Sequence, residues 1–304
     1  MKSKKSKIKK NTAKPELSKE FNINLKCSPN SPEKQRHDYT CYSDDSLLKI
    51  RNFWNARHPD RRIDTEEPRD IWGQLKNNMK NVCDAESCWL RQNFIKEKLD
   101  KELLQFTFAP KSPNSWKANE YEWLSSLDIA EVMRQYEHAY PSFQFIGPSP
   151  IDFDSLKIYG QCVWEELCKF ELYDYIHKGK TKIGIVFNTD PHYKEGSHWI
   201  ALFINVSKKY IYYFDSNGNP PPNEVKKFSE RVKSQGSSLG IDLNIMSNYP
   251  RSHQKTDSEC GMYVLYFIIK LLTSNVKDPA LFGKQRIPDE EVHKMRNEYF
   301  NPNL

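Results

Sequence analysis

Residues 254–268 read QKTDSECGMYVLYFI, a polar segment that ends at a single cysteine and continues as an apolar run. The run after Cys260 is apolar on every side, which predicts a helix buried in a core. At the start of such a helix, the unpaired N–H groups and the helix dipole favour a thiolate. Gly261 would let the backbone pass close to the group that the sulfur attacks. The segment therefore predicts a nucleophilic Cys260, although a free cysteine can also be simply buried and inert.

The composition indicates a globular protein. The chain has 304 residues, of which 38% are hydrophobic and 13% aromatic, enough for one large domain or two smaller ones. It has no run of about 18 apolar residues, and no apolar stretch follows its lysine-rich start, so we expect neither a membrane span nor a signal peptide. We therefore expect a protein that is not secreted.

The cysteines predict a reducing compartment and no metal. There are seven, an odd count without a dense framework. Neither Cys83/Cys88 nor Cys162/Cys168 has the two-residue gap typical of zinc ligands, and no histidine pair lies at ligand spacing. We expect neither a metal nor another cofactor.

The net charge of +6 comes from one end of the chain. Residues 1–14 contain seven lysines and no acid, so the remaining residues sum to about −1. Residues 1–40 are polar and show no periodicity, which predicts a largely disordered basic tail. Such a tail can bind nucleic acid weakly through the lysines of residues 1–14, serve as a nuclear address, or remain solvated.

Residues 41–106 have a helical pattern. We expect short helices over 46–54 and 68–79, and a third over 88–104 from a broad apolar stripe. Pro110 and the segment 112–115 then read as a linker.

From residue 107 onward the pattern is mixed α and β. Helices are expected over 123–136, 162–176, 223–233 and 289–299, and strands over 143–146, 183–188, 199–206, 210–214 and 241–246. The first strand is expected to end at the segment GPSP, and the residues 207–209 predict a hairpin between the third and fourth strands.

Two residues at the open end of this hairpin could serve a cysteine nucleophile. His198 lies between the polar loop HYKEGS and the strand that begins at Trp199, and Asp215 follows the neighbouring strand. In an antiparallel hairpin these ends lie side by side, so Asp215 can accept a hydrogen bond from His198. His192 and His253 are the competing bases, but neither has a strand-borne acid beside it. Gln254, six residues before Cys260, could direct its amide at the reacting carbonyl oxygen.

These residues also carry a family resemblance. The order His198-Trp199, Asp215, Gln254 and Glu259-Cys260-Gly261 resembles the adenovirus-protease and SUMO-specific-protease clan of cysteine peptidases. The segments GSHWIALFIN, YYFDSNGNPPP and RSHQKTDSECGMYVLYFI are most similar to the polyprotein-processing proteases of large cytoplasmic DNA viruses, such as African swine fever virus and mimivirus. The resemblance covers residues 107–304. It implies an α+β, papain-like cysteine protease domain with a mixed central sheet flanked by helices, preceded by an N-terminal helical extension over 41–106.

The resemblance also implies a role for each residue. Cys260 would be the nucleophile, His198 its base, Asp215 the group that orients the base, and Gln254 a donor in the oxyanion hole. Trp123, expected at a helix start, resembles the family's substrate-binding tryptophan. The residues after Trp123 depart from the SUMO-protease pattern, so recognition of SUMO does not follow from the resemblance.

Three functions are compatible with these residues. The favoured function is an endopeptidase that processes viral structural polyproteins in the virion or host cytoplasm. The second is an isopeptidase that removes a ubiquitin-like modifier, and the third is an inactive binding module. Trp123 and Trp199 would enclose the substrate on two sides and leave no room for a Cβ, which predicts cleavage after Gly-Gly. Both tryptophans could instead lie in the core.

Overall fold

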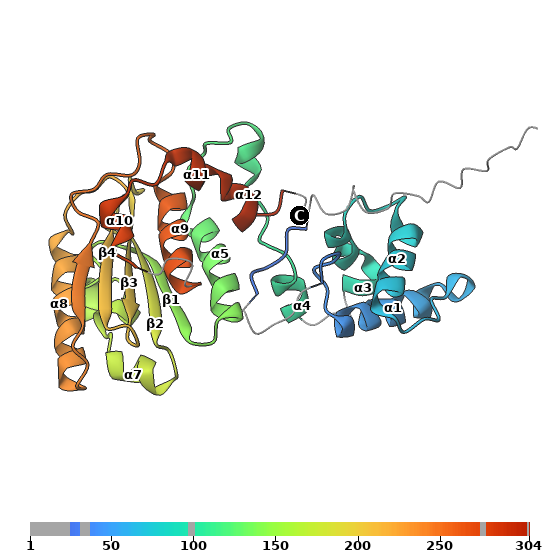
Figure 1. The fold of residues 1–304 in the computed structure, drawn as a ribbon, viewed down its shortest axis with the longest axis horizontal. Coiled ribbons are helices and arrows are strands. Elements are labelled where there is room, and N and C mark those ends of the chain that lie inside the picture. The colour runs from blue at the N-terminus through green and yellow to red at the C-terminus, as the bar shows by residue number, and fades with distance from the viewer. Residues whose placement is uncertain (1–24, 31–36, 97–100, 274–277, 303) are drawn as a thin grey trace, which may run out of the picture.

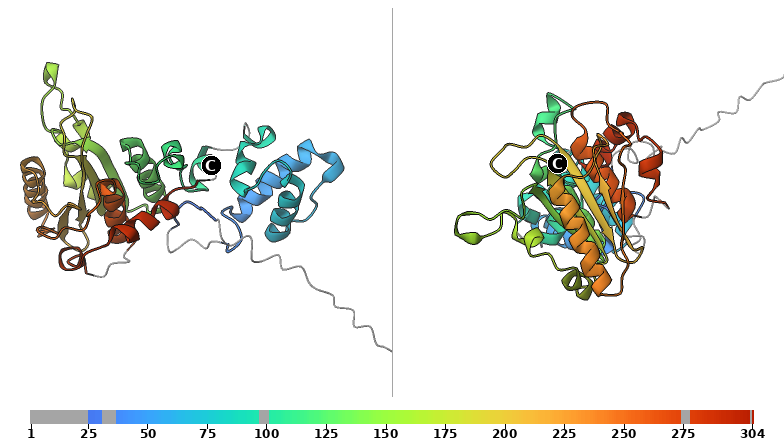
Figure 2. Two further views of the ribbon diagram at one scale, coloured as in Figure 1. Left: turned by 90° about the horizontal axis from the view of Figure 1, so that it is seen from above. Right: turned by 90° about the vertical axis from the view of Figure 1, so that its left-hand side faces the viewer.

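A computed structural model describes residues 25–30, 37–96, 101–273, 278–302 and 304. Figure 1 shows an α/β lobe built around one sheet and a smaller group of helices at the other end of the long axis. The C-terminus lies between the two parts, as both Figure 1 and the left view of Figure 2 show. Among the described residues no helix is long and apolar enough to cross a membrane. The lysines of residues 1–14 lie outside the described residues, so their contact with nucleic acid stays a prediction.

The sheet of the α/β lobe is mixed. Its strands follow the order β1-β2-β3-β4-β5, in which β1 and β2 are parallel, β4 and β5 are parallel, and β3 is antiparallel to both of its neighbours. The predicted α+β fold with a mixed central sheet flanked by helices is therefore confirmed. The strands are β1 (Phe143–Pro150), β2 (Lys182–Asn188), β3 (Trp199–Asn205), β4 (Tyr210–Phe214) and β5 (Asn244–Ser247).

Helices cover both faces of this sheet, with α8 on one side and α5 and α9 on the other (Figure 1). Successive side chains of β3 point to opposite faces, so Ala201 and Phe203 join the core beneath α9, whereas Leu202 and Ile204 join the core beneath α8. All four are fully buried, which explains why β3 reads as a continuous apolar run. The helices of this lobe are α5 (Ser126–Ala139), α6 (Glu165–Cys168), α7 (Leu172–His177), α8 (Asn223–Ser238), α9 (Cys260–Leu272), α10 (Leu281–Lys284), α11 (Asp289–Lys294) and α12 (Arg296–Tyr299).

The helix α9 is the centre of the larger core. It begins at Cys260, and each of its residues except Lys270 is buried. It packs against β3 and α5. The prediction of a helix that is apolar on every side because it is buried on every side is confirmed.

The smaller part contains α1 (Asp44–Arg57), α2 (Pro68–Met79), α3 (Asn93–Lys96) and α4 (Lys101–Phe106). The first two occupy the predicted positions. The single third helix over 88–104 is wrong, because residues 86–91 form a 3₁₀ helix and Gln92 is extended with φ −68° and ψ 135°. An apolar stripe does not distinguish one continuous helix from successive short turns that face the same core.

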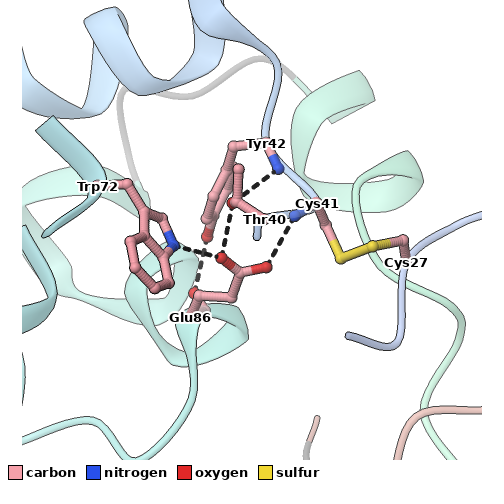
Figure 3. Close-up of a disulfide and its surroundings, with 6 residues drawn as sticks. All are labelled: Cys27, Thr40, Cys41, Tyr42, Trp72 and Glu86. Carbon is pink, nitrogen blue, oxygen red and sulfur yellow. Dashed lines mark hydrogen bonds between the residues drawn. A yellow bond between two sulfur atoms is a disulfide. The ribbon is translucent and has the colours of Figure 1, made fainter. Parts of the chain in front are cut away.

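A half-buried carboxylate organises this helical part (Figure 3). Glu86 accepts hydrogen bonds from the Thr40 hydroxyl at 2.7 Å, the Cys41 N–H at 2.9 Å and the Trp72 indole at 2.9 Å. Its backbone oxygen accepts a further bond from the Tyr42 hydroxyl at 2.7 Å. Burial raises the pKa of Glu86, and the three bonds to its carboxylate oppose that shift. One side chain therefore fixes the chain entering α1 against α2.

The described end of the predicted tail is attached to the rest of the protein. Cys27 pairs with Phe108 in an antiparallel bridge, and the N–H of Ala109 donates to the Lys26 carbonyl at 2.8 Å. Farther on, the N–H of Asn301 donates to the Pro110 carbonyl at 2.8 Å. Residues 25–28, 107–110 and 301 thus meet between the two parts of the molecule, although we expected residues 1–40 to be largely disordered.

Several expected boundaries in the α/β lobe are wrong, including the start of β5 at Asn244 rather than 241 and the division of the helix expected over 289–299 into α11 and α12. Strand β1 does not end before GPSP but continues to Pro150, because Ser149 and Pro150 still pair with β2 after a bulge. Gly147 makes this possible, since it has φ +102° and a Cβ there would lie 2.6 Å from the Val186 oxygen. The helix expected over 162–176 is interrupted at Phe170, between α6 and α7.

The cysteines also differ from expectation. We expected free thiols, but six of the seven form disulfides, namely Cys27–Cys41, Cys83–Cys88 and Cys162–Cys168. Two of these pairs are separated by only 5 and 6 residues in the sequence. This spacing is not typical of zinc ligands, but it is compatible with a disulfide that closes a short segment of the chain. The cysteine that stays free is Cys260.

The packing of α9 on the sheet predicts a large loss of stability for Phe267→Ala. Phe267 is fully buried and stacks on Phe214 with ring centroids 4.6 Å apart. Truncating such a ring leaves a cavity and costs about 3–5 kcal/mol. Urea unfolding of the α/β lobe should show this loss, whereas Leu281→Ala, at a position 44% exposed, should change the free energy of unfolding by less than about 1 kcal/mol.

Candidate active site

Cys260 is the first residue of α9 and is 2% exposed. Its position at the positive end of a buried helix is the one that favours a thiolate. Because the other six cysteines are paired, Cys260 is the thiol available for chemistry.

The hairpin of β3 and β4 brings His198 to Asp215. Ala201 pairs with Phe214 in the antiparallel register, so Asp215 lies two residues from the position opposite His198, on the same face and diagonally across the hairpin. His198 Nε2 lies 2.7 Å from the Asp215 Oδ1 atom. The pairing expected from the hairpin is therefore present in the structure.

The turn after β4 holds the Asp215 carboxylate in one orientation. The N–H groups of Asn217 and Asn219 donate to its two oxygens at 2.9 Å and 3.3 Å. The Asn248 side chain holds the backbone of the same residue, accepting from its N–H at 2.9 Å and donating to its carbonyl at 2.7 Å. Asp215 is 2% exposed and can therefore fix the orientation of the imidazole.

His198 also interacts with Cys260. Burial alone would lower the pKa of His198, but hydrogen bonds to Asp215 and Cys260 outweigh it and raise this pKa to about 9. Since Nε2 faces the aspartate, Nδ1 is the nitrogen left for the sulfur. The structure therefore brings together Cys260, His198 and Asp215, as predicted. With this raised pKa, the His198 imidazole is protonated at neutral pH.

The structure fixes Gln254 against the turn that follows Asp215. Its Oε1 atom accepts from the Ser216 hydroxyl at 2.7 Å, and its Nε2 donates to the Thr256 carbonyl. Its backbone N–H donates to the Ser216 carbonyl at 2.9 Å. An amide nitrogen has two hydrogens, so one remains for a further acceptor. The place of Gln254 in an oxyanion hole stays a prediction.

The two tryptophans have different environments. Trp123 is 44% exposed and precedes α5, which begins only at Ser126 after a capping box formed by Ser125 and Asp128. The expected helix start at Trp123 is therefore wrong. Trp199 is 8% exposed, and its indole N–H donates to the Leu124 carbonyl at 3.0 Å.

Trp199 is thus mainly a core residue, although it also lines a surface cavity. This cavity has a volume of about 320 Å³ and lies beside the strand that starts after His198. Ser126, Pro150, Trp164 and Asn188 contribute further to its walls. Neither His198 nor Cys260 is among the residues that line it.

The competing histidines have other partners. His192 lies on an exposed loop with its Nδ1 atom 2.6 Å from the Asp152 carboxylate. His253 is fully buried, where burial lowers its pKa to about 4, and its Nδ1 accepts from the Ile287 N–H at 3.0 Å. Of the three histidines considered, His198 has bonds to both an acid and Cys260.

Gly261 has a packing role. A Cβ at this position would lie 2.9 Å from the Leu124 Cβ, closer than real Cβ contacts. The glycine therefore lets Leu124, whose carbonyl holds Trp199, pack directly on the first turn of α9. The expected role of Gly261 in the approach of a substrate stays a prediction, and the contact with Leu124 had no signal in the sequence.

Comparisons with known proteins agree with this geometry. Residues 180–303 match the Ulp1 protease family, C-terminal catalytic domain. The chain is 30% identical over 233 residues to a cysteine protease of African swine fever virus, and the match covers 72% of this chain and 83% of that protein.

The chain belongs to the Ulp1 protease family.

It is a cysteine protease. A thiol protease of Acanthamoeba polyphaga mimivirus is 29% identical over 297 residues, which cover 90% of this chain and 92% of that one. A crystal structure of the African swine fever virus protease superimposes with a TM-score of 0.65 at 24% identity and covers 90% of this chain and 95% of the other. The fold therefore extends over both parts of the molecule.

The raised pKa of His198 predicts the pH dependence of the protease. Activity should fall on the alkaline side as the imidazolium loses its proton near pH 9. Asp215→Asn removes the carboxylate that raises this pKa, so the alkaline limb of kcat/KM should move down by roughly one pH unit or more. Asp154→Asn, which changes an exposed carboxylate paired with Arg231, should leave the limb in place. An unchanged limb in Asp215→Asn would contradict the assignment.

The contact between Gly261 and Leu124 predicts that Gly261→Ala is harmful. The added methyl group must displace Leu124, which should cost about 1–3 kcal/mol in the free energy of unfolding and disturb Trp199. Gly73→Ala is the matched control, because a Cβ at this helical position meets nothing within 4 Å. The melting temperature and kcat/KM should both fall for the first variant, and neither should fall for the control.

Proposed function

We propose that the protein is a viral endopeptidase that cleaves after Gly-Gly in structural polyproteins, within the virion or host cytoplasm. The observation that carries this proposal is the joint placement of Cys260, His198 and Asp215, with Trp199 directly after the base. The relatives with similar sequences come from mimivirus and African swine fever virus, which also supports the proposal.

The chemistry proceeds through a covalent intermediate. The Cys260 thiolate donates an electron pair to the carbonyl carbon of the scissile bond, and the carbonyl π electrons move to the oxygen. Backbone N–H groups at the start of α9 and the amide of Gln254 stabilise this oxyanion. As the intermediate collapses, the C–N bond breaks and the amine takes the proton of the His198 imidazolium.

A water molecule completes the reaction. His198, now neutral, removes a proton from the water as its oxygen attacks the thioester carbon. The C–S bond breaks, which releases the carboxylic acid and restores the thiolate and imidazolium. Asp215 holds the imidazole in the orientation that both steps need.

The preference for Gly-Gly follows from the space near the base. Trp123 is partly exposed and lies one residue before Leu124, whose carbonyl accepts from the Trp199 indole. The buried Trp199 is thus tied to the segment that carries the partly exposed Trp123. A backbone that passes between them is excluded when it carries a bulky side chain.

Cleavage of a peptide series tests the proposal. The two residues before the scissile bond are varied from Gly-Gly to Ala-Ala and Leu-Leu, with Cys260→Ala as the inactive control. Gly-Gly should exceed Leu-Leu by about 10²-fold in kcat/KM for the wild type, and Trp123→Ala should narrow the ratio. Equal cleavage of all three peptides by the wild type would refute the steric preference.

The alternative activity is removal of a ubiquitin-like modifier. It is favoured by one observation, that the related protease of several African swine fever virus isolates is named a SUMO-1 cysteine protease. Isopeptide cleavage would use the same residues with a lysine amine as leaving group. Parallel incubation with SUMO conjugates and with virion precursor proteins separates the two, and faster processing of the conjugates would replace the endopeptidase proposal.

A further inference from the structure

Glu259, the residue directly before Cys260, has a buried carboxylate. The residue is 1% exposed, and its side chain makes no capping hydrogen bond to α9. Its oxygens instead accept from Arg296, with Nε 3.2 Å from both and Nη2 at 3.1 Å from one of them. The His293 Nδ1 atom lies 2.9 Å from the other oxygen.

A carboxylate at this place has an electrostatic consequence for Cys260. A like charge next to a titrating group disfavours its charged form, so the negative charge of Glu259 opposes a thiolate on the adjacent residue. It also opposes the effect of the helix dipole. A buried cation on the same carboxylate cancels this repulsion, and Arg296 is itself only 4% exposed.

Arg296 also holds the segment that leads to Trp123. Its Nη1 donates to the Glu122 carbonyl at 2.9 Å, and its guanidinium lies 4.5 Å from the centroid of the Trp116 ring. The next residues along this segment are Trp123 and Leu124, which packs on Gly261. One side chain therefore connects the start of α9 to the partly exposed tryptophan.

The charges around the first turns of α9 come from three directions. From the edge of the sheet, His198 contacts Cys260 and is itself bonded to Asp215. From α11 and α12 come the side chains that contact Glu259 or α9 itself. The titratable and charged groups on these two helices are Asp289, Glu291, His293 and Arg296.

We propose that Arg296 is a positioning residue for the protease reaction. Its guanidinium neutralises Glu259, so that Cys260 can react as a thiolate. The same side chain holds the Glu122–Trp123 peptide near the start of α9. The inference rests on the proposed function of Cys260 as the nucleophile. Arg296 touches neither the sulfur nor the substrate in this role. It acts through Glu259 and through the segment before α5.

The pH dependence of Cys260 alkylation by iodoacetamide tests the electrostatic part. Arg296→Gln should move the pH of half-maximal labelling rate upward by roughly one unit, because Glu259 loses its guanidinium partner and keeps only the contact with His293. Glu259→Gln should move it downward by a similar amount, since the carboxylate is removed and the cation stays. The double variant should return it to the wild-type value.

A charge-preserving variant tests the positioning part. Arg296→Lys keeps the cation but loses the fork that reaches both Glu259 and the Glu122 carbonyl. It should leave the labelling profile near that of the wild type, while kcat/KM for the Gly-Gly peptide falls at least about 10-fold. Recovery of full peptide cleavage in the lysine variant would show that the contact with Glu122 does not matter.

Arg231→Gln is the matched control. Arg231 also lies over an aromatic ring, 5.1 Å from the Phe228 centroid, and donates to the Leu167 and Cys168 carbonyls, but it lies on α8 away from Glu259. Arg231→Gln should change neither the pH dependence of Cys260 labelling nor kcat/KM for the Gly-Gly peptide. A similar shift in this variant would mean that the effect reflects general destabilisation.

The outcomes separate this inference from the function on which it rests. If Arg296→Gln does not fold, the downward shift in Glu259→Gln still decides the electrostatic part. Labelling that depends on His198 but is insensitive to every substitution at 259 and 296 would overturn the role of Arg296 alone. Labelling that is insensitive to His198→Ala would overturn the assignment of the nucleophile and its base.

Discussion

The antiparallel pairing of β3 with β4 is the constraint on which the active site depends. His198 and Asp215 are separated by 17 residues, and they meet because Ala201 pairs with Phe214. A slip of one residue would turn every side chain of β3 to the opposite face. Both faces of this strand are filled, so packing excludes the slip and fixes the distance between base and acid.

Local patterns in the sequence were sufficient for part of this structure. The hairpin and α9 were predicted because a short turn and a continuous apolar run are local signals, and His198 and Asp215 followed from the hairpin. The end of β1 and the break at Phe170 could not be predicted, since they depend on pairing with β2 and on the core beneath α8. The pair Glu259 and Arg296 also had no signal, because contacts across 37 residues are set by the packed fold.

The carboxylates of Glu86 and Glu259 are stabilised in different ways. Glu86 has neutral donors, and its pKa is raised by burial, so its role is to fix the chain between α1 and α2. Glu259 has a guanidinium on its oxygens. A neutral set of donors would leave a net negative charge beside Cys260, and the cation avoids this. The difference matches a structural role at one position and an electrostatic one at the other.

The pairing of the other six cysteines has a consequence for the lifetime of the enzyme. A nucleophilic thiol is commonly lost when a second thiol of the same chain attacks or captures it in an oxidising medium. Here each potential intramolecular partner is already bound to another sulfur, and Cys260 is covered by the surrounding protein. While these disulfides are intact, the chain has no second free thiol that could be oxidised together with Cys260, so inactivation requires a small oxidant or an external disulfide that reaches the sulfur directly.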